Sequence, residues 1–198
     1  MKKIFYLFRH GETNLNAEGI WQGARINSAL NEVGKTQAAE LGKKLLPLGI
    51  EVIYSSTLRR AMQTTSIVND KLDVPSILCG GLIECNFGKA EGKTYEEVRR
   101  LYPETVNAVL YPTPATWDAR FPGLYSESKH EVYTRVRNTL EFIAAKDNSM
   151  VIGISTHGGV MSALLAGLGD YGTELPNCCV AQIEYDDISN RMSFVKML

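Results

Sequence analysis

An excess of charge and long apolar runs are both missing from this sequence of 198 residues. Lysine and arginine together number 21 and aspartate and glutamate 22, so the formal net charge is −1. A basic surface of the kind that binds nucleic acid is therefore not indicated. No run of about 18 apolar residues occurs, which argues against a membrane-spanning helix. We expect no nucleic acid and no membrane among the partners, and any phosphate chemistry must rely on local cations.

Cysteine is also scarce. The four cysteines are Cys79, Cys85, Cys178 and Cys179. None lies in a CxxC pair, and adjacent cysteines rarely bond each other, so reduced thiols of a cytoplasmic protein are indicated rather than a zinc site. The apolar run at 4–8 is far shorter than the core of a signal peptide and is followed by a charge, so it predicts a strand and not an export signal.

The chain length fits one domain, 1–198, with a sizeable core. Hydrophobic residues make up 44% and charged residues 22%, a balance typical of globular proteins. Strand-like and helix-like segments alternate, which predicts an α/β fold with a mostly parallel central sheet. Strands are predicted at 4–8, 52–54, 77–78 and 151–154, and helices at 31–48, 58–72, 94–101, 127–145 and 158–168. Two alternating runs, 180–185 and 191–197, predict a hairpin and therefore one antiparallel edge.

Two details of this pattern bear on the site. Thr94 is the expected N-cap of the helix at 94–101, and Ser56 or Thr57 that of the helix at 58–72. Between 102 and 125 the alternation breaks, and this stretch holds four of the seven prolines together with Trp117. Apolar and aromatic residues are too frequent there for a linker, which predicts a lid insertion over the sheet. The lid aromatics either line a substrate site or form a small core of their own.

Two of the three histidines occupy matching positions. His10 in "LFRHG" and His157 in "ISTHGG" each follow an apolar strand and precede glycine. In a parallel sheet both would reach the carboxyl edge, where such folds bind ligands. Gly11, Gly158 and Gly159 would let the backbone approach a ligand closely, and helix N-termini at this edge favour anions. Two structural histidines are the alternative, but Arg9 beside His10 favours a site, because a buried arginine needs an anionic partner.

Two further segments supply an arginine and an acid. The stretch "SSTLRRAMQT" places Arg59 and Arg60 in the first turn of a predicted helix, where cations are unfavourable unless one of them meets an anion. For Arg59 we favour a solvated surface position. The stretch "LIECNFG" places Glu84 after an apolar pair and before a glycine-containing loop, where it is a candidate proton donor.

Together these residues predict phosphoryl transfer through a phosphohistidine. His10 is the candidate nucleophile, with its other ring nitrogen held by a backbone carbonyl of the loop 11–16. Arg9, Arg60 and a protonated His157 would offset the charge of the phosphoryl oxygens, and Glu84 would protonate the leaving group. No aspartate and histidine cluster with metal-ligand spacing occurs, so we predict no metal and no other cofactor.

Several motifs carry a family resemblance. They are "FRHGET" at 8–13, "NAEGIWQG" at 16–23, "ALNEVGKTQAAELG" at 29–42, "SSTLRRAMQT" at 55–64, "LIECNFGKAEGKT" at 82–94, "SESKHEVYTRV" at 126–136 and "STHGGV" at 155–160. In this order they resemble the histidine phosphatase superfamily, also called phosphoglycerate mutase-like, on its phosphatase side. The chain departs from the family pattern at Ser126, where Gly-Glu-Ser is usual, and within "GARINS", which lacks the usual aspartate after Gln-Gly.

The resemblance implies a three-layer α/β/α sandwich and assigns roles to residues. In the family the first histidine is phosphorylated, and a glutamate serves as acid and then as base. The residues that receive catalytic roles by this resemblance are His10, Glu84, Arg9, Arg60 and His157. Asn16 would add a phosphate contact, and Gln22 lies where some members reach the substrate. With Gly158, these two are the expected substrate-binding residues.

The favoured function is that of a metal-independent phosphomonoesterase acting on a small phosphorylated metabolite. A cofactor-dependent phosphoglycerate mutase is the first alternative, for which Arg120 and Lys89 are the nearest candidates for the additional cations it requires. A non-catalytic module that binds a phosphorylated ligand is the second, although no catalytic residue is missing. The oligomeric state stays open, with a homodimer among the options.

Overall fold

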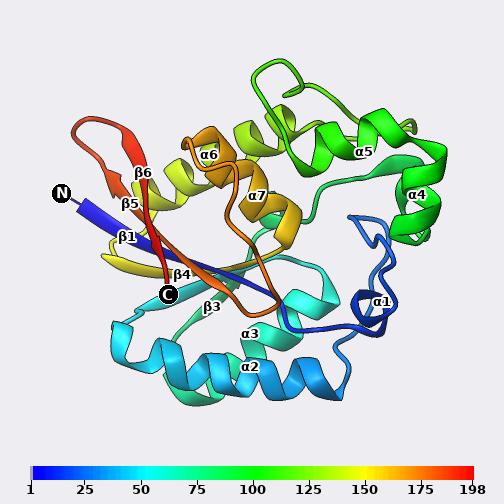
Figure 1. Ribbon diagram of the computed structural model, residues 1–198. Helices are drawn as coiled ribbons and strands as arrows, with labels where there is room; N and C mark the ends of the chain where they lie inside the picture. The colour runs from blue at the N-terminus through cyan, green and yellow to red at the C-terminus, as the bar shows by residue number, and fades with distance from the viewer. Residues whose placement is uncertain (1) are drawn as a thin grey trace.

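The computed structural model describes residues 2–198, and its centre is a six-stranded sheet between two layers of helices (Figure 1). The strands are β1 (Lys2–Arg9), β2 (Val52–Ser55), β3 (Ser76–Leu78), β4 (Val151–Thr156), β5 (Val180–Asp186) and β6 (Arg191–Met197). They are ordered β3-β2-β4-β1-β5-β6 across the sheet. The first four of these run parallel, whereas β5 pairs antiparallel with β1, and β6 with β5. The predicted α/β fold with a mostly parallel sheet and an antiparallel edge is confirmed.

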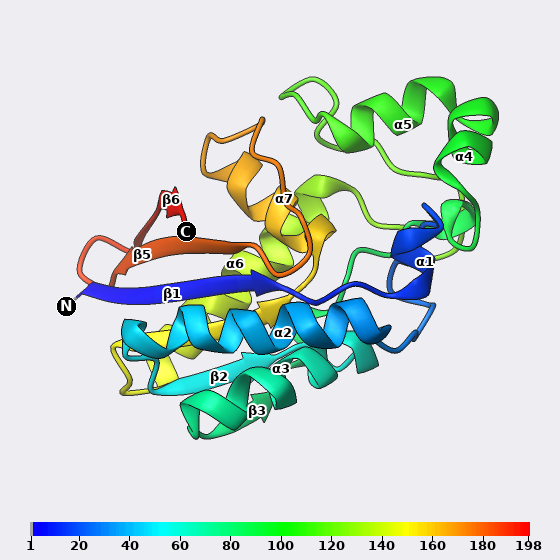
Figure 2. The same ribbon diagram turned by 60° about the horizontal axis from the view of Figure 1, so that its bottom comes forward.

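The alternation of side chains along β1 explains the two helical layers. Because successive side chains of a strand point to opposite faces, Phe5 and Leu7 enter one core and Tyr6 and Phe8 the other. Helices α2 (Glu32–Leu45) and α3 (Arg59–Leu72) cover the face of Tyr6. Helices α6 (Lys129–Lys146) and α7 (Gly158–Gly167) cover the opposite face (Figure 2).

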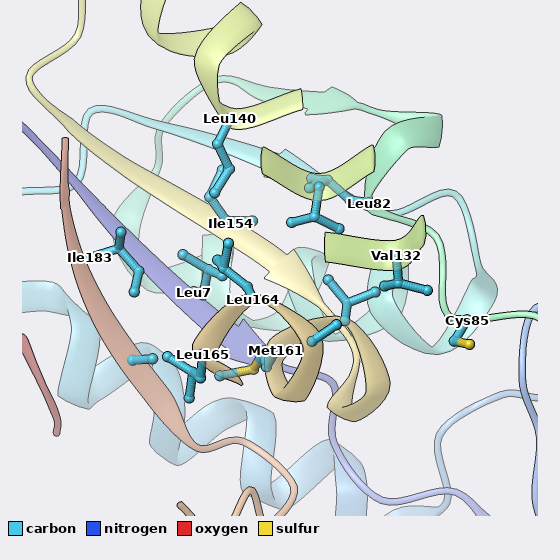
Figure 3. Close-up of a cluster of buried hydrophobic side chains, with 14 of the residues drawn as sticks. Leu7, Leu82, Cys85, Val132, Leu140, Ile154, Met161, Leu164, Leu165 and Ile183 are labelled. Atoms are coloured by element: carbon cyan, nitrogen blue, oxygen red, sulfur yellow. The ribbon is translucent and has the colours of Figure 1, made fainter. Parts of the chain in front are cut away.

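The larger core lies between the sheet and the pair α6 and α7. There Leu7 and Ile154 of the strands meet Leu140 of α6 and Met161 and Leu164 of α7 (Figure 3). All five side chains are essentially inaccessible to solvent, so this packing fixes α7 against the strand that precedes it. Among residues 2–198, no helix is both long enough and apolar enough to cross a membrane.

The helix starts show one success and one error of the sequence analysis. Thr94 caps α4 (Tyr95–Leu101) through a capping box with Glu97, as predicted. The prediction of Ser56 or Thr57 as the cap of α3 is wrong, because the N-cap is Leu58 and it offers no side-chain hydrogen bond. Ser56 is instead buried, with its hydroxyl 2.7 Å from a ring nitrogen of His157.

The predicted lid contains a helix that the pattern did not indicate. Helix α5 (Pro103–Leu110) begins at a proline, which suits the first turn because no intrahelical N–H is needed there. With α4 and α1 (Asn14–Ala17), it stands beyond the carboxyl ends of the parallel strands (Figures 1 and 2). Three short 3₁₀ helices, η1 (Leu46–Leu48), η2 (Gly80–Leu82) and η3 (Gly88–Ala90), complete the helical elements of residues 2–198.

Candidate active site

The strand register brings the two histidines together. Arg9, the last residue of β1, pairs with Thr156, the last residue of β4. His10 and His157 therefore leave the sheet side by side, and the His10 amide donates to the Thr156 carbonyl at 3.1 Å. Their ring centroids lie 5.2 Å apart, and both side chains are buried. The carboxyl edge of the sheet thus holds both histidines.

The contacts of His10 define which ring nitrogen carries the proton. Nδ1 lies 2.7 Å from the carbonyl oxygen of Gly11, the kind of backbone partner expected in this loop. A carbonyl oxygen only accepts, so Nδ1 is protonated and Nε2 has a free electron pair. Arg60 Nε donates to that pair at 3.2 Å. Burial, and then Arg60 and Arg9, lower the pKa of His10 well below its usual value, which keeps the ring neutral at pH 7.

Arg60 is buried and its guanidinium is fixed by the backbone. It is only 1% exposed, and its Nη1 and Nη2 donate to the carbonyls of Ile26 and Gly23, each at 2.8 Å. Burial lowers the pKa of Arg60 to about 10, so the group stays charged at neutral pH. Arg59 is exposed, in agreement with the surface position favoured for it. Arg60 is therefore buried at the candidate site, whereas its neighbour Arg59 faces solvent.

Two buried side-chain nitrogen atoms beside His10 lack a partner. Arg9 donates from Nη1 to the carbonyl of Leu175 at 2.6 Å, but its Nε has no hydrogen-bond partner within the described chain. The same holds for Nδ1 of His157, whose Nε2 is 2.7 Å from Ser56 Oγ. Buried polar groups are nearly always paired, so two such atoms at one place indicate room for an anion.

The protonated His157 expected from the sequence is a point that the structure corrects. Burial, followed by the charge of Arg60 and the proximity of His10, lowers the pKa of His157 well below its usual value. The ring is neutral in the unliganded protein because a further positive charge beside Arg60 would be costly in a buried site. A neutral imidazole still donates one N–H, so His157 can contact an anion without carrying charge.

The side chain of Glu84 contacts the first turn of α7. Its carboxylate accepts hydrogen bonds from the amides of Cys85 at 2.8 Å, Gly159 at 3.1 Å and Val160 at 3.2 Å. A Cβ atom at position 159 would approach Oε1 of Glu84 to 2.5 Å. Glycine at this position therefore lets the helix start touch the carboxylate. The three donors fix the orientation of Glu84, whose side chain borders the cavity described next.

A cavity of about 210 Å³ opens at this edge. Of the residues named from the sequence, those that line it are Arg9, His10, Asn16, Gln22, Arg60, Glu84, Gly158 and Gly159. Within the described chain, His157 is the exception among the predicted catalytic residues: it packs against His10 and does not itself line the cavity. Gln22 accepts a hydrogen bond from Ser28, and Asn16 from the amide of Thr13. Most of the predicted set is thus gathered around one space.

Several lining residues were missed by the sequence analysis. They are Ile20, Trp21, Gly23, Phe87, Tyr95, Val109, Leu110, Lys129, Ser162 and Leu175. For most of these no local signal exists, because an apolar side chain in a cavity wall resembles any other core residue. Lys129 is different: it is the first residue of α6, and a cation is unfavourable at a helix N-terminus. The argument that singled out Arg60 applies equally to Lys129.

The aromatic residues of the predicted lid do not line the cavity. Tyr111 and Tyr125 are exposed to solvent, and Phe121 is buried in an aromatic cluster with Trp21 and Phe87. Trp117 packs near Tyr133 of α6. Among the described residues of the lid, only Val109 and Leu110 of α5 reach the cavity wall. Phe121 and Trp117 therefore pack against residues outside the lid, and Tyr111 and Tyr125 face solvent, so these aromatics form neither a substrate wall nor a core of their own.

Comparison with known proteins places the chain in a family. Residues 5–196 match the model of the histidine phosphatase superfamily (branch 1). The chain is 30% identical over 184 residues to the uncharacterized phosphatase PhoE of Bacillus subtilis, covering 90% of this chain and 86% of that protein. It is 35% identical over 163 residues to the metal-independent phosphoserine phosphatase of Arabidopsis thaliana, covering 80% and 65% of the two chains.

A solved structure agrees. Bacillus stearothermophilus YhfR superposes with a TM-score of 0.79 at 30% identity, covering 97% of this chain and 94% of the other. The fold and the comparisons define a phosphomonoesterase, an enzyme that hydrolyses phosphate esters. The chain belongs to branch 1 of the histidine phosphatase superfamily, which confirms the resemblance found in its motifs.

Proposed function

We propose that this enzyme hydrolyses phosphate monoesters of small metabolites without a metal ion, through a phosphohistidine formed on His10. The observation that carries the proposal is the state of the His10 ring. Its Nδ1 proton is held by the Gly11 carbonyl, and its Nε2 electron pair is directed at Arg60. A neutral imidazole oriented in this way beside fixed positive charge is a competent nucleophile for phosphorus.

In the first step Nε2 of His10 attacks phosphorus, and the bond from phosphorus to the ester oxygen breaks. The charge on the phosphoryl oxygens is offset by Arg9 and Arg60, with an N–H of His157 as a further donor. Glu84, in its protonated form, gives its proton to the leaving oxygen, which departs as an alcohol. The ring proton on Nδ1 remains hydrogen-bonded to the Gly11 carbonyl throughout this step.

In the second step a water molecule attacks the phosphohistidine. The Glu84 carboxylate, left ionised by the first step, takes one proton from that water as the new phosphorus–oxygen bond forms. The bond between phosphorus and Nε2 breaks, and its electron pair returns to His10. Inorganic phosphate is released, and both side chains regain their starting protonation states.

The two cations that the sequence offered for the mutase alternative do not border the cavity. A phosphoglycerate mutase needs additional cations for its acidic substrate, and Arg120 and Lys89 were the candidates from the sequence. Neither is among the described residues that line the cavity. Arg120 instead pairs with Glu131 at 3.0 Å, and Lys89 is exposed. A cavity of about 210 Å³ is also suited to a small leaving group.

The absence of a metal is proposed on the same grounds. Arg9 and Arg60 supply the positive charge that a metal ion provides in other phosphatases. Among residues 2–198, no group of three or more histidine, cysteine, aspartate or glutamate side chains is arranged to hold a metal ion. The Arabidopsis relative is itself named a metal-independent phosphatase.

The decisive experiment is to trap the phosphoenzyme in excess EDTA. Purified enzyme is mixed with p-nitrophenyl phosphate and acid-quenched or base-quenched within milliseconds. We expect a phosphoryl group that is labile to acid and stable to base on the peptide containing His10, and none in His10→Ala. Turnover that needs added Mg²⁺ or Zn²⁺, or a wild-type enzyme that traps no phosphohistidine, would contradict the proposal.

We further propose that residues 1–198 act as one domain in the cytoplasm. All four cysteines are unpaired in this structure, which suits a reducing compartment. Alkylation of the unfolded protein without prior reduction, read by intact mass, should modify four thiols. Fewer modified thiols would point to a disulfide and to an oxidising compartment.

A further inference from the structure

A buried lysine borders the cavity and plays no part in the chemistry proposed above. Lys129, at the start of α6, is only 6% exposed and lines the cavity. Its Nζ donates to Ser162 Oγ at 3.0 Å and to the carbonyl of Gly159 at 3.3 Å. Both acceptors belong to α7 and are neutral.

This lysine has no carboxylate within salt-bridge distance among the described residues. Lys129 forms no salt bridge with any residue of the described range 2–198. Burial disfavours an unpaired ammonium, and it lowers the pKa of Lys129. The positive end of α6 adds a further unfavourable interaction. A buried ammonium without a salt bridge is therefore suited to bind an anion from outside the chain.

The position of Lys129 relative to Glu84 indicates which part of a substrate Lys129 would contact. Gly159 joins the two residues: its amide donates to Glu84, and its carbonyl accepts from Lys129. Gly159 therefore places Lys129 next to Glu84, the residue proposed to give the leaving oxygen its proton.

Ser162 belongs to this part of the cavity through its contact with Lys129. Ser162 lies one helical turn beyond Gly159, about 5 Å along α7, on the same face of the helix. Trp21 also lines the cavity, and its indole N–H is buried without a partner within the described chain. The part of the cavity around Lys129 thus has one cation and one hydroxyl, and the cavity as a whole has a further unpartnered donor in Trp21.

We propose that Lys129, assisted by Ser162, binds a carboxylate carried by the leaving group, so that the preferred substrates are phosphate monoesters of small hydroxy acids. This inference rests on the proposed phosphatase function and names its substrate class. A carboxylate is favoured over a second phosphate because one ammonium matches a single negative charge. The two other cations of the cavity, Arg9 and Arg60, stand beside His10.

The test uses substrates that differ only in the carboxylate. O-Phosphoserine and O-phosphoethanolamine form one such pair, and 3-phosphoglycerate and glycerol 3-phosphate form a second in which no ammonium is present. We expect the wild-type enzyme to have a kcat/KM for the acid about 10- to 100-fold above that for its partner, the usual contribution of a hydrogen bond to a charged group. In Lys129→Met this ratio should fall to near one in both pairs, and Lys129→Arg should retain most of it.

Two further variants keep the test decisive. Lys89→Met removes an exposed cation outside the cavity and should leave the ratio at the wild-type value. Ser162→Ala should lower the ratio in the same direction as Lys129→Met, which covers the case in which the lysine variant does not fold. Thermal unfolding of each variant establishes that it is folded.

The outcomes separate the two proposals. Phosphate release with a ratio near one in the wild type, or with equal losses on both members of each pair in Lys129→Met, would overturn the role of Lys129 and leave the phosphatase function standing. Equal losses would instead make Lys129 a positioning residue for Glu84. No release of phosphate from any of the substrates, p-nitrophenyl phosphate included, would overturn the proposed function and this inference with it.

Discussion

Arg60 donates a hydrogen bond from Nε to Nε2 of His10 at 3.2 Å, so the arginine meets the ring at the atom that would attack phosphorus. The other two nitrogens of the guanidinium are bound to backbone carbonyls of the segment 23–26. Because these two carbonyls fix the guanidinium, its Nε can donate to a phosphoryl oxygen in place of the His10 ring nitrogen without a large movement of Arg60. The same contact keeps a positive charge beside His10 and so favours the neutral ring.

Arg60→Ala should lower kcat/KM on p-nitrophenyl phosphate by roughly 10²- to 10³-fold, the usual loss when one preorganised donor is removed. Arg59→Ala is the matched control, since the neighbouring side chain is exposed, and its effect should be far smaller. Steady-state kinetics of the two variants provide the measurement. A larger loss in Arg59→Ala than in Arg60→Ala would show that the wrong arginine has been assigned to the phosphoryl group.

Glu84→Gln should separate substrates by leaving group. An alkoxide needs a proton as it departs, whereas p-nitrophenolate does not, so phosphorylation by alkyl esters should slow by roughly 10²- to 10⁴-fold and that by p-nitrophenyl phosphate much less. Rapid-quench measurement of phosphoenzyme formation isolates this step from hydrolysis. If both kinds of substrate slow equally, Glu84 is not the acid of the first step.

Stability should decrease towards acid because of the two buried histidines. The pKa values of His10 and His157 are lowered by burial and by nearby arginines. Below pH 6.5, the usual pKa of histidine, the unfolded chain therefore binds protons that the folded chain does not. The free energy of unfolding consequently decreases as the pH is lowered. Urea titrations from about pH 7.5 to about pH 5.5 should show this fall, with a slope smaller by about one proton in His157→Gln. An identical slope in that variant would mean that His157 titrates normally in the folded protein.

Incubation with 3-phosphoglycerate distinguishes phosphatase from mutase. We expect free phosphate and little 2-phosphoglycerate, with or without added 2,3-bisphosphoglycerate. Among the described residues that line the cavity, Lys129 is the one cation besides Arg9 and Arg60, and a bisphosphate would need more. Enzymatic assays of both products in the same reaction make the comparison. Fast isomerisation that depends on the bisphosphate would favour the mutase instead.

The sequence by itself determined that the sheet is mostly parallel with an antiparallel edge, and it identified most of the candidate site. Apolar strand patterns placed His10 and His157 after two strands, and parallel strands end at one edge whatever the details of packing. The pair Arg59 and Arg60 was found for a comparable reason, since a cation in the first turn of a helix is unfavourable without an anion, and the family motif singled out Arg60 of the two. These signals are local: each is contained in a few neighbouring residues together with a general rule about strands or helices.

Only the tertiary structure decided the protonation of His157, the role of Ser56 and the presence of Lys129 in the cavity. Ser56 and His157 are separated by 101 residues, and Lys129 and Ser162 by 33, so no local pattern records either contact. A protonated His157 was a reasonable expectation from the sequence, but the charge that a histidine carries depends on how deeply it is buried and on which cations surround it. Burial and charge proximity are properties of the packed chain, because they depend on elements that meet only when α6 and α7 close over the sheet.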